Sequence, residues 1–159
     1  SMDGVGDVYN YIRQDGDWDN VYNNMLQLST VPNIDLAAGI TVQAHNIFHM
    51  PEFYSFWRNS PIDLKFITAN ILQTPRYLSP ALWHGEYRQA ILEKLGNATE
   101  WHPEMTRFYT YVNNNEPDYN MYVRMRKYTR DIEARYTKDV TCVTSIIVKN
   151  GLRVTSIKF

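Results

Sequence analysis

The sequence predicts an α/β fold in which helices separate parallel strands. Within the first hundred of its 159 residues, segments with a helical spacing of apolar side chains alternate with two largely apolar runs that lack this spacing. Strands separated by helices pair in parallel, because the crossover between them needs a dozen or more residues. The last third of the chain changes character, since two long helical patterns there precede two β-branched runs.

Local signals define the first elements. Residues 7–13 form a short predicted helix, which Gly16 interrupts. Asp17 is a suitable N-cap for a second helix that extends to residue 31. The run 34–44 is apolar without helical period, and this pattern predicts a strand covered by helices on both faces.

The alternation then repeats. Pro51 opens a helix, because proline is well tolerated at the first helical position. Residues 60–72 alternate weakly and predict a second strand, which a loop with two prolines follows. Residues 81–96 predict an amphipathic helix closed by Gly96.

The C-terminal third contains two further predicted helices and a hairpin. The helices cover residues 101–115 and 117–136. Two β-branched runs within 140–159 are joined by Asn150-Gly151, a strong signal for a type I′ turn. A β-hairpin is therefore predicted at the end of the chain.

Composition excludes several classes of protein. With 16 Lys and Arg against 17 Asp and Glu, the chain lacks the basic excess that phosphate binding requires, so we do not expect nucleic acid as a partner. No apolar run approaches the roughly 20 residues needed to cross a membrane, and no signal peptide is visible, which favours a cytoplasmic protein. Cys142 is the single cysteine, so neither a disulfide within the chain nor a cysteine-rich metal site can form.

Four segments of the chain resemble, in order and spacing, the second half of radical S-adenosylmethionine (SAM) enzymes, closest to the SPASM/twitch type found in phages. The segments are SMDG with YNYIR, WDNVYNNMLQLS, ITVQAHNIFHMPEF and ITANILQTPRYLS. The resemblance implies that residues 1–96 form a partial, half parallel β/α barrel. Residues 97–159 would then form a helical extension with the terminal hairpin.

The resemblance also implies a function, with one departure. The parent activity is radical-based modification of a peptide or other substrate, and it depends on three cysteines, spaced CxxxCxxC, that hold a [4Fe–4S] cluster. This chain has only Cys142 and cannot hold such a cluster in the family's way. We therefore expect a non-catalytic piece of a longer enzyme, truncated at the loop after the family's fourth strand, with no catalytic residue of its own.

The same resemblance assigns five residues to SAM, namely Ser1, Asp3, Gly4, Arg13 and Asn46. The first three would lie at the mouth of a strand, Arg13 would pair with a carboxylate, and Asn46 would close the next strand near the ligand. Structural alternatives exist for the same residues. Asp and Asn cap turns, Gly permits a positive φ, and an arginine at a helix end is often simply solvated.

Two other patterns receive a structural interpretation. His45 and His49 form an HxxxH pair, but Pro51 starts the following helix, so the pair spans a loop and does not predict a metal site. Residues 119–130 mix aromatic and basic side chains, as single-strand-binding segments do. Acidic residues follow at once, and Tyr122, Met125 and Tyr128 fit a packed stripe, so a helix with a solvated face is favoured.

Partners follow from the fold. A half barrel has an open strand edge, which predicts a homodimer formed by pairing with another copy. Two alternative functions stay open: a stand-alone α/β module that binds a protein through its aromatic helices, and a phage accessory protein that binds single-stranded nucleic acid.

Overall fold

The computed structural model describes residues 1–136 of the chain. Its main elements are α1 (Asp7–Ile12), α2 (Trp18–Ser29), β1 (Leu36–Val42), α3 (Met50–Asn59), β2 (Leu64–Ile71), α4 (Gly85–Ala98), α5 (Pro103–Asn114) and α6 (Tyr119–Tyr136). Three short 3₁₀ helices connect them, η1 (Ile47–His49), η2 (Arg76–Leu78) and η3 (Pro80–Leu82). The predicted hairpin over residues 140–159 lies outside the described residues.

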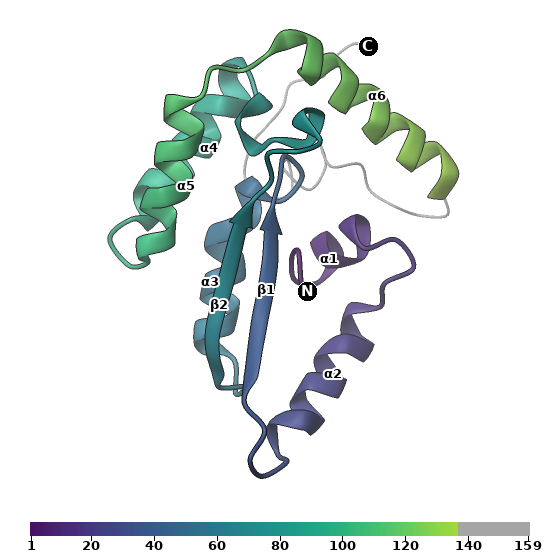
Figure 1. Cartoon of the computed structure of the whole chain (residues 1–159), viewed down its shortest axis with the longest axis vertical. Coiled ribbons are helices and arrows are strands. Elements are labelled where there is room, and N and C mark those ends of the chain that lie inside the picture. Colours follow the sequence, from purple (N-terminus) through teal and green to yellow (C-terminus); the bar gives the residue numbers. More distant parts are fainter. Residues whose placement is uncertain (137–159) are drawn as a thin grey trace.

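β1 and β2 form a two-stranded parallel sheet, joined through η1 and α3 (Figure 1). The parallel direction agrees with the alternation of helices and strands in the sequence. The register pairs Ala37 with Phe66, Gly39 with Thr68 and Thr41 with Asn70. Because side chains alternate between the faces of a strand, these six residues share one face of the sheet.

The predicted half barrel is wrong. Residues 1–136 form a mixed arrangement of six α-helices and a single pair of strands, which is not part of a barrel. Before β1, the chain contacts the sheet through one backbone hydrogen bond, in which Met2 N–H donates to Gly39 O at 2.7 Å, and it then turns into α1. The local sequence signals required only one parallel pair, and the further strands came from the family resemblance alone.

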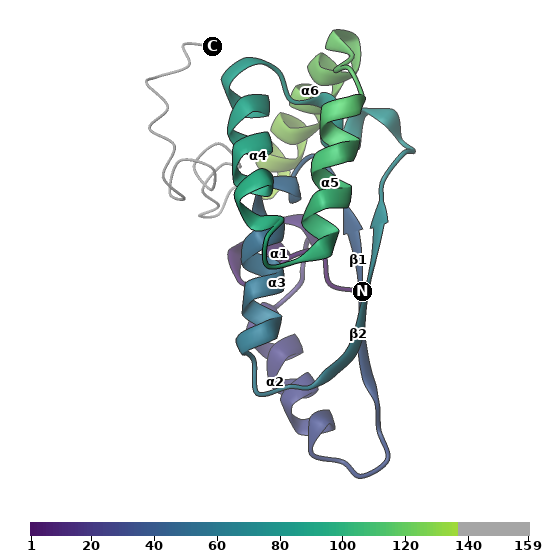
Figure 2. The same ribbon diagram turned by 90° about the vertical axis from the view of Figure 1, so that its left-hand side faces the viewer.

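Within residues 1–136, helices cover only one face of the sheet. In Figure 2 the two strands run along one side of the molecule, and the helices lie on the other side of them. Ile40, Val42 and Ala69 point to this side and share a hydrophobic cluster with Phe53 of α3. For the part of the chain that the structure describes, the prediction that helices cover both faces of the first strand is therefore also wrong.

α4 and α5 form a helical hairpin held by Arg88. The guanidinium of this α4 residue donates to the backbone carbonyls of Val112, Asn113 and Asn115 at the end of α5, and to Ala81 O in η3. These carbonyls have no partner within α5, so Arg88 caps the helix. α4 continues past Gly96, where the predicted end was placed, and stops at Ala98.

α6 crosses above the carboxyl end of the sheet (Figure 1). Its side chain Met125 is buried, and Tyr122 contacts the rings of Trp83 and His84. The packed stripe predicted within residues 119–130 is confirmed at these two positions. No helix within residues 1–136 is both long and apolar enough to span a bilayer.

Candidate functional site

The residues that the resemblance assigned to SAM come together beside the carboxyl-terminal half of β1. Asp3 is buried, and its Oδ1 accepts a hydrogen bond from Thr41 N–H at 2.8 Å. Its Oδ2 lies 2.8 Å from Arg13 Nε, and Arg13 Nη2 donates to Ser1 Oγ at 2.6 Å. Asp3 therefore links the N-terminal turn, the end of α1 and β1.

Asn46 is the most deeply buried polar residue of this group, with 0% of its surface exposed. Its Oδ1 accepts from Gln43 N–H at 2.7 Å. Its Nδ2 donates to the backbone oxygens of Asp3 and Thr41, each at 2.8 Å. Both amide hydrogens are thus used within the chain, and Asn46 ties the N-terminal turn to the end of β1.

Together these contacts complete the outer edge of β1, on the side away from β2. Gly39 O accepts from Met2 N–H, Thr41 N–H donates to the Asp3 carboxylate, and Thr41 O accepts from the Asn46 amide. Backbone groups on a buried strand edge need hydrogen-bond partners. Here the Met2 backbone and the side chains of Asp3 and Asn46 supply the hydrogen bonds that a neighbouring strand would otherwise make. Asp3 and Asn46 consequently brace the fold.

Gly4 also has a packing role. A Cβ added at this position would lie 2.7 Å from Val8 Cγ1 and 3.0 Å from Tyr9 N, so only glycine allows α1 to approach its own N-terminal turn this closely. The positive φ of this segment occurs at Gly6 instead. Of the five assigned residues, Ser1 and Arg13 remain accessible, and 42% of the Arg13 side chain is exposed.

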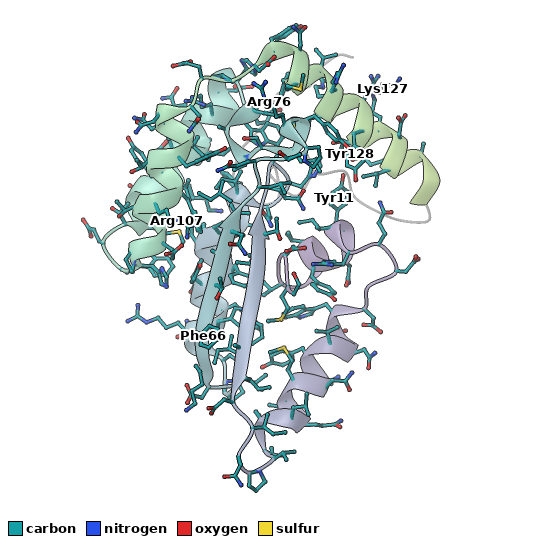
Figure 3. All side chains as sticks on the ribbon, in the orientation of Figure 1. Tyr11, Phe66, Arg76, Arg107, Lys127 and Tyr128 are labelled. Atoms are coloured by element: carbon teal, nitrogen blue, oxygen red, sulfur yellow. The ribbon has the colours of Figure 1, made fainter. Side chains whose placement is uncertain are left out.

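The uncovered side of the sheet is the feature that sequence reasoning missed. We call it the open face, and it comprises Ala37, Gly39, Thr41, Phe66, Thr68 and Asn70. A Cβ added at Gly39 would meet no atom within 4 Å. Apart from Phe66, which is 62% exposed (Figure 3), the open face carries only small or polar side chains. The alternation of Gly and Thr with apolar residues along the first strand was the available signal.

His45 and His49 take separate structural roles. His45 Nε2 lies 2.9 Å from Thr129 Oγ1 of α6, and its ring contacts those of Tyr11 and Tyr128. Burial lowers the pKa of His45 to about 4, so the ring is neutral at neutral pH.

His49 faces the turn that precedes α1. Its Nε2 accepts from Val5 N–H at 3.4 Å. Burial lowers its pKa to about 4, with Glu52 raising the pKa and Lys94 lowering it. Within residues 1–136, no group of three or more His, Cys, Asp or Glu side chains is placed to hold a metal ion.

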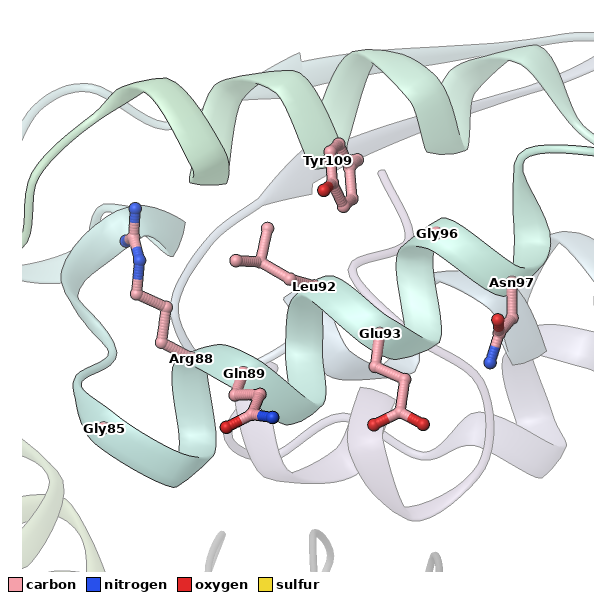
Figure 4. A pocket seen from close by; sticks show the side chains of 8 residues that line it. All are labelled: Gly85, Arg88, Gln89, Leu92, Glu93, Gly96, Asn97 and Tyr109. Atoms are coloured by element: carbon pink, nitrogen blue, oxygen red, sulfur yellow. The ribbon is translucent and has the colours of Figure 1, made fainter.

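Among the cavities lined by residues 1–136, three have linings that include none of the five assigned residues. One of about 530 Å³ lies along α4 and α5, beside Arg88, Leu92 and Tyr109 (Figure 4). A second, of about 440 Å³, lies between the loop after β2 and the start of α6. A third, of about 450 Å³, lies between α3, the start of β2 and the turn from α4 to α5.

Comparisons with protein-family models, with curated proteins and with solved structures find no match. The resemblance to radical SAM enzymes therefore stays a prediction. The function has to be inferred from the open face, the Arg13 network and the cavities.

Proposed function

We propose that this chain is a ligand-binding part of a radical SAM-like protein, which holds SAM at the carboxyl end of the open face and performs no redox chemistry by itself. The observation that carries the proposal is the open face: an uncovered parallel sheet with small and polar side chains. Arg13, whose side chain is 42% exposed, lies beside the outer edge of β1, paired with the Asp3 carboxylate that accepts from Thr41 N–H.

The character of the open face favours a ligand over another layer of protein. Parallel sheets are usually covered on both faces and then carry Val, Ile and Leu on both. Here the paired residues are Gly39 with Thr68 and Thr41 with Asn70, which offer hydroxyl and amide groups beside a bare stretch of backbone. Ligands of α/β sheets bind at the carboxyl ends of the strands, which is where Thr41 and Asn70 lie.

Arg13 supplies a positive charge that can pair with the carboxylate of SAM. Asp3 and Ser1 engage its Nε and Nη2, and Nη1 has no hydrogen-bond partner within the described residues. A guanidinium fixed in this way can bind a carboxylate, such as the one at the amino-acid end of SAM. The residues present thus fit the ligand, although Asp3, Gly4 and Asn46 would act only by positioning Arg13 and the turn.

In radical SAM enzymes the cluster cleaves SAM and generates a radical, and this chemistry needs thiolate ligands that a chain with one cysteine does not offer. The role of this chain is limited to binding and orienting. The peptide or protein substrate of the parent activity would be modified only where a cluster is supplied by other residues.

Calorimetric titration with SAM and S-adenosylhomocysteine tests the proposal. Gly39→Val adds bulk above the sheet without a clash, so we expect normal folding and loss of binding. Arg13→Gln should weaken binding about tenfold, the usual cost of losing a charge-assisted pair. Ala37→Val, on the same face but farther from the carboxyl end, is the matched control and should bind normally. If the wild-type chain binds neither compound, or if Gly39→Val binds as well as the wild type, the proposal fails.

Self-association is a second, separate proposal, and it concerns the outer edge of β2. Leu72 N–H donates to Val42 O, so by alternation Ile67 and Ala69 direct their backbone groups away from β1. Ala69 O is already bonded to Arg107 Nη2 at 2.9 Å, which leaves the earlier part of the edge for pairing with another copy. Light scattering should show a dimer, and Arg107→Ala should strengthen it. A monomer in both cases contradicts this proposal.

A protein-interaction module that uses aromatic helices has less support. Trp18 of α2 contacts the rings of Phe56 and Trp57 of α3, so these aromatic side chains pack against one another. These aromatic residues of α2 and α3 are therefore engaged inside the molecule.

A further inference from the structure

We infer that the outward side of α6 binds single-stranded nucleic acid. We call this side the basic stripe, and it comprises the exposed residues Tyr119, Val123, Arg124, Lys127 and Arg130. In Figure 3, Lys127 projects from the side of α6 opposite the sheet, whereas Tyr128 projects toward the sheet. The inference is independent of the proposed function, because neither Gly39 nor Arg13 takes part in it.

Charge is distributed unevenly along the chain. Residues 1–118 contain 7 Lys and Arg against 14 Asp and Glu, whereas residues 119–159 contain 9 against 3. The two parts therefore carry net charges of −7 and +6, and the total of −1 conceals this difference. The expectation that nucleic acid is not a partner rested on the total alone. A basic segment joined to an acidic remainder indicates a polyanion as a partner of the basic part.

The fold directs the apolar and the basic residues of α6 to opposite sides. Met125 packs into the hydrophobic core, and 2% of its surface is exposed. Tyr119, Val123 and Lys127 follow one another at intervals of four residues, so they lie on one side of the helix. Arg130 joins this side three residues later. The basic stripe is therefore presented to solvent by the same packing that buries Met125.

The cations of the basic stripe are available to phosphates. Arg124, Lys127 and Arg130 form no ion pair within residues 1–136, and neither does the exposed Asp131 on the same helix. The three cations recur every third residue, about 4.5 Å apart along the helix axis. A row of unpaired cations complements the row of negative charges along a nucleic-acid backbone.

Tyr119 favours a single strand over a duplex. Its surface is 67% exposed, although its ring contacts those of His84 and Tyr122 at centroid distances of 6.0 and 6.5 Å. An unpaired base can stack on such a ring, and this contact is tolerant of sequence because every base has a π face. The bases of a duplex are already stacked on one another and do not offer that face.

An anionic membrane is a poorer partner for the same side of α6. A helix that lies on a membrane buries a wide apolar face in it. In α6, Met121, Tyr122 and Met125 pack against the core of the molecule. Val123 is the one aliphatic residue of the basic stripe. The stripe thus offers charge for a polyanion but little apolar surface for a bilayer.

Fluorescence polarisation of the full chain with labelled oligo(dT) and oligo(U) tests the inference. Both strands should bind at low salt, because stacking and phosphate contacts are common to DNA and RNA. The logarithm of the affinity should fall with the logarithm of the salt concentration with a slope of about −2 or steeper. Each of the three cations contributes about −0.7 to this slope on a single strand.

Three variants separate the contributions of charge and stacking. Arg124→Gln, Lys127→Gln and Arg130→Gln, combined in one chain, should make the slope shallower by about 2 and leave the thermal midpoint unchanged, since all three side chains are exposed. Arg58→Gln removes an exposed arginine of α3 and is the matched control, which should bind as the wild type does. Tyr119→Leu should weaken binding of single strands about tenfold and leave duplex binding unchanged.

Several results would overturn the inference. These are no binding of either oligonucleotide at low salt, wild-type affinity and salt dependence in the combined variant, and an equal loss of single-strand and duplex binding in Tyr119→Leu. Tighter binding to phosphatidylserine vesicles than to oligo(dT) would assign the stripe to a membrane instead. A salt-sensitive dimer that the combined variant abolishes would assign it to the acidic part of a second copy. None of these results bears on SAM binding, which depends on Gly39 and Arg13.

Discussion

On the helix-covered face of the sheet, Ile40 and Val42 are almost completely buried, whereas their strand neighbours Gly39 and Thr41 on the open face keep contact with solvent. The same two strands thus carry a hydrophobic face and a face of small and polar groups. Burial of apolar surface is the main source of folding free energy, so the covered face holds the fold together. The open face contributes little to stability and is available for binding.

The largest expected effect tests directly whether the covered face contributes more to stability than the open face. Ile40→Ala should lower the free energy of unfolding by about 2–5 kcal/mol, because it leaves a cavity in the core. Phe66→Ala on the open face should change it by less than about 0.5 kcal/mol, as exposed substitutions do. Urea denaturation measures both. A similar loss for the two variants would mean that the open face is covered in solution.

A somewhat smaller effect is expected at the edge of β1. Asn46→Ala removes two buried and one partly buried hydrogen bond and should cost about 3 kcal/mol, at about 1 kcal/mol for each. Arg13→Gln breaks a partly exposed ion pair with Asp3 and should cost less than about 1 kcal/mol. If thermal or urea unfolding shows Arg13 to be the more important of the two, Asn46 does not brace the edge as described.

The helices that cover the sheet and its carboxyl end also bury two histidines, which makes stability depend on pH. The pKa of His45 and of His49 is lowered to about 4, whereas the unfolded chain protonates a histidine near 6.5. The contribution of each neutral ring is complete above pH 6.5 and is lost as the pH falls toward 4. Between about pH 7 and pH 5 each histidine should cost about 2 kcal/mol.

Urea denaturation at the two pH values measures this loss. His49→Gln should remove about half of it, because glutamine does not titrate. If the loss of stability between pH 7 and pH 5 is the same in His49→Gln as in the wild type, His49 is protonated in the folded chain at pH 5. That result would contradict its burial beside Val5.

Local signals in the sequence predicted the helices well. Asp17 was expected to cap the second helix, and its side chain does accept from Asn20 N–H at 3.2 Å. Pro103 opens α5 and Pro51 lies in the first turn of α3, in keeping with the preference of proline for these positions. Capping and first-turn preferences depend on neighbours in sequence, and for this reason they can be read without a structure.

Contacts between distant residues could not be predicted in the same way. The sequence shows an Asp at position 3 and an Asn at position 46, but not that a backbone N–H 38 residues away meets the carboxylate. An amide that braces a turn and an amide that binds a ligand look alike in a sequence. The prediction of a half barrel was wrong for a related reason, since it depended on strands that the local sequence pattern did not contain.

The hydrogen bonding of Tyr54 and Trp57 could not be predicted from the sequence either. Their spacing of three residues places them on one side of the helix that the sequence predicted after Pro51. Whether a buried hydroxyl or indole finds a partner depends on segments far along the chain, here the turn before α5 and the start of β2.

Gly39 has a practical consequence beyond its role in the sheet. Because a Cβ at position 39 would meet no atom of residues 1–136 within 4 Å, Gly39→Cys would place a thiol on the open face without disturbing the strands. Combined with Cys142→Ser, it would be the only thiol of the chain. The rate at which a maleimide dye modifies that thiol would then report, in any cell extract or purified mixture, whether something shields this face.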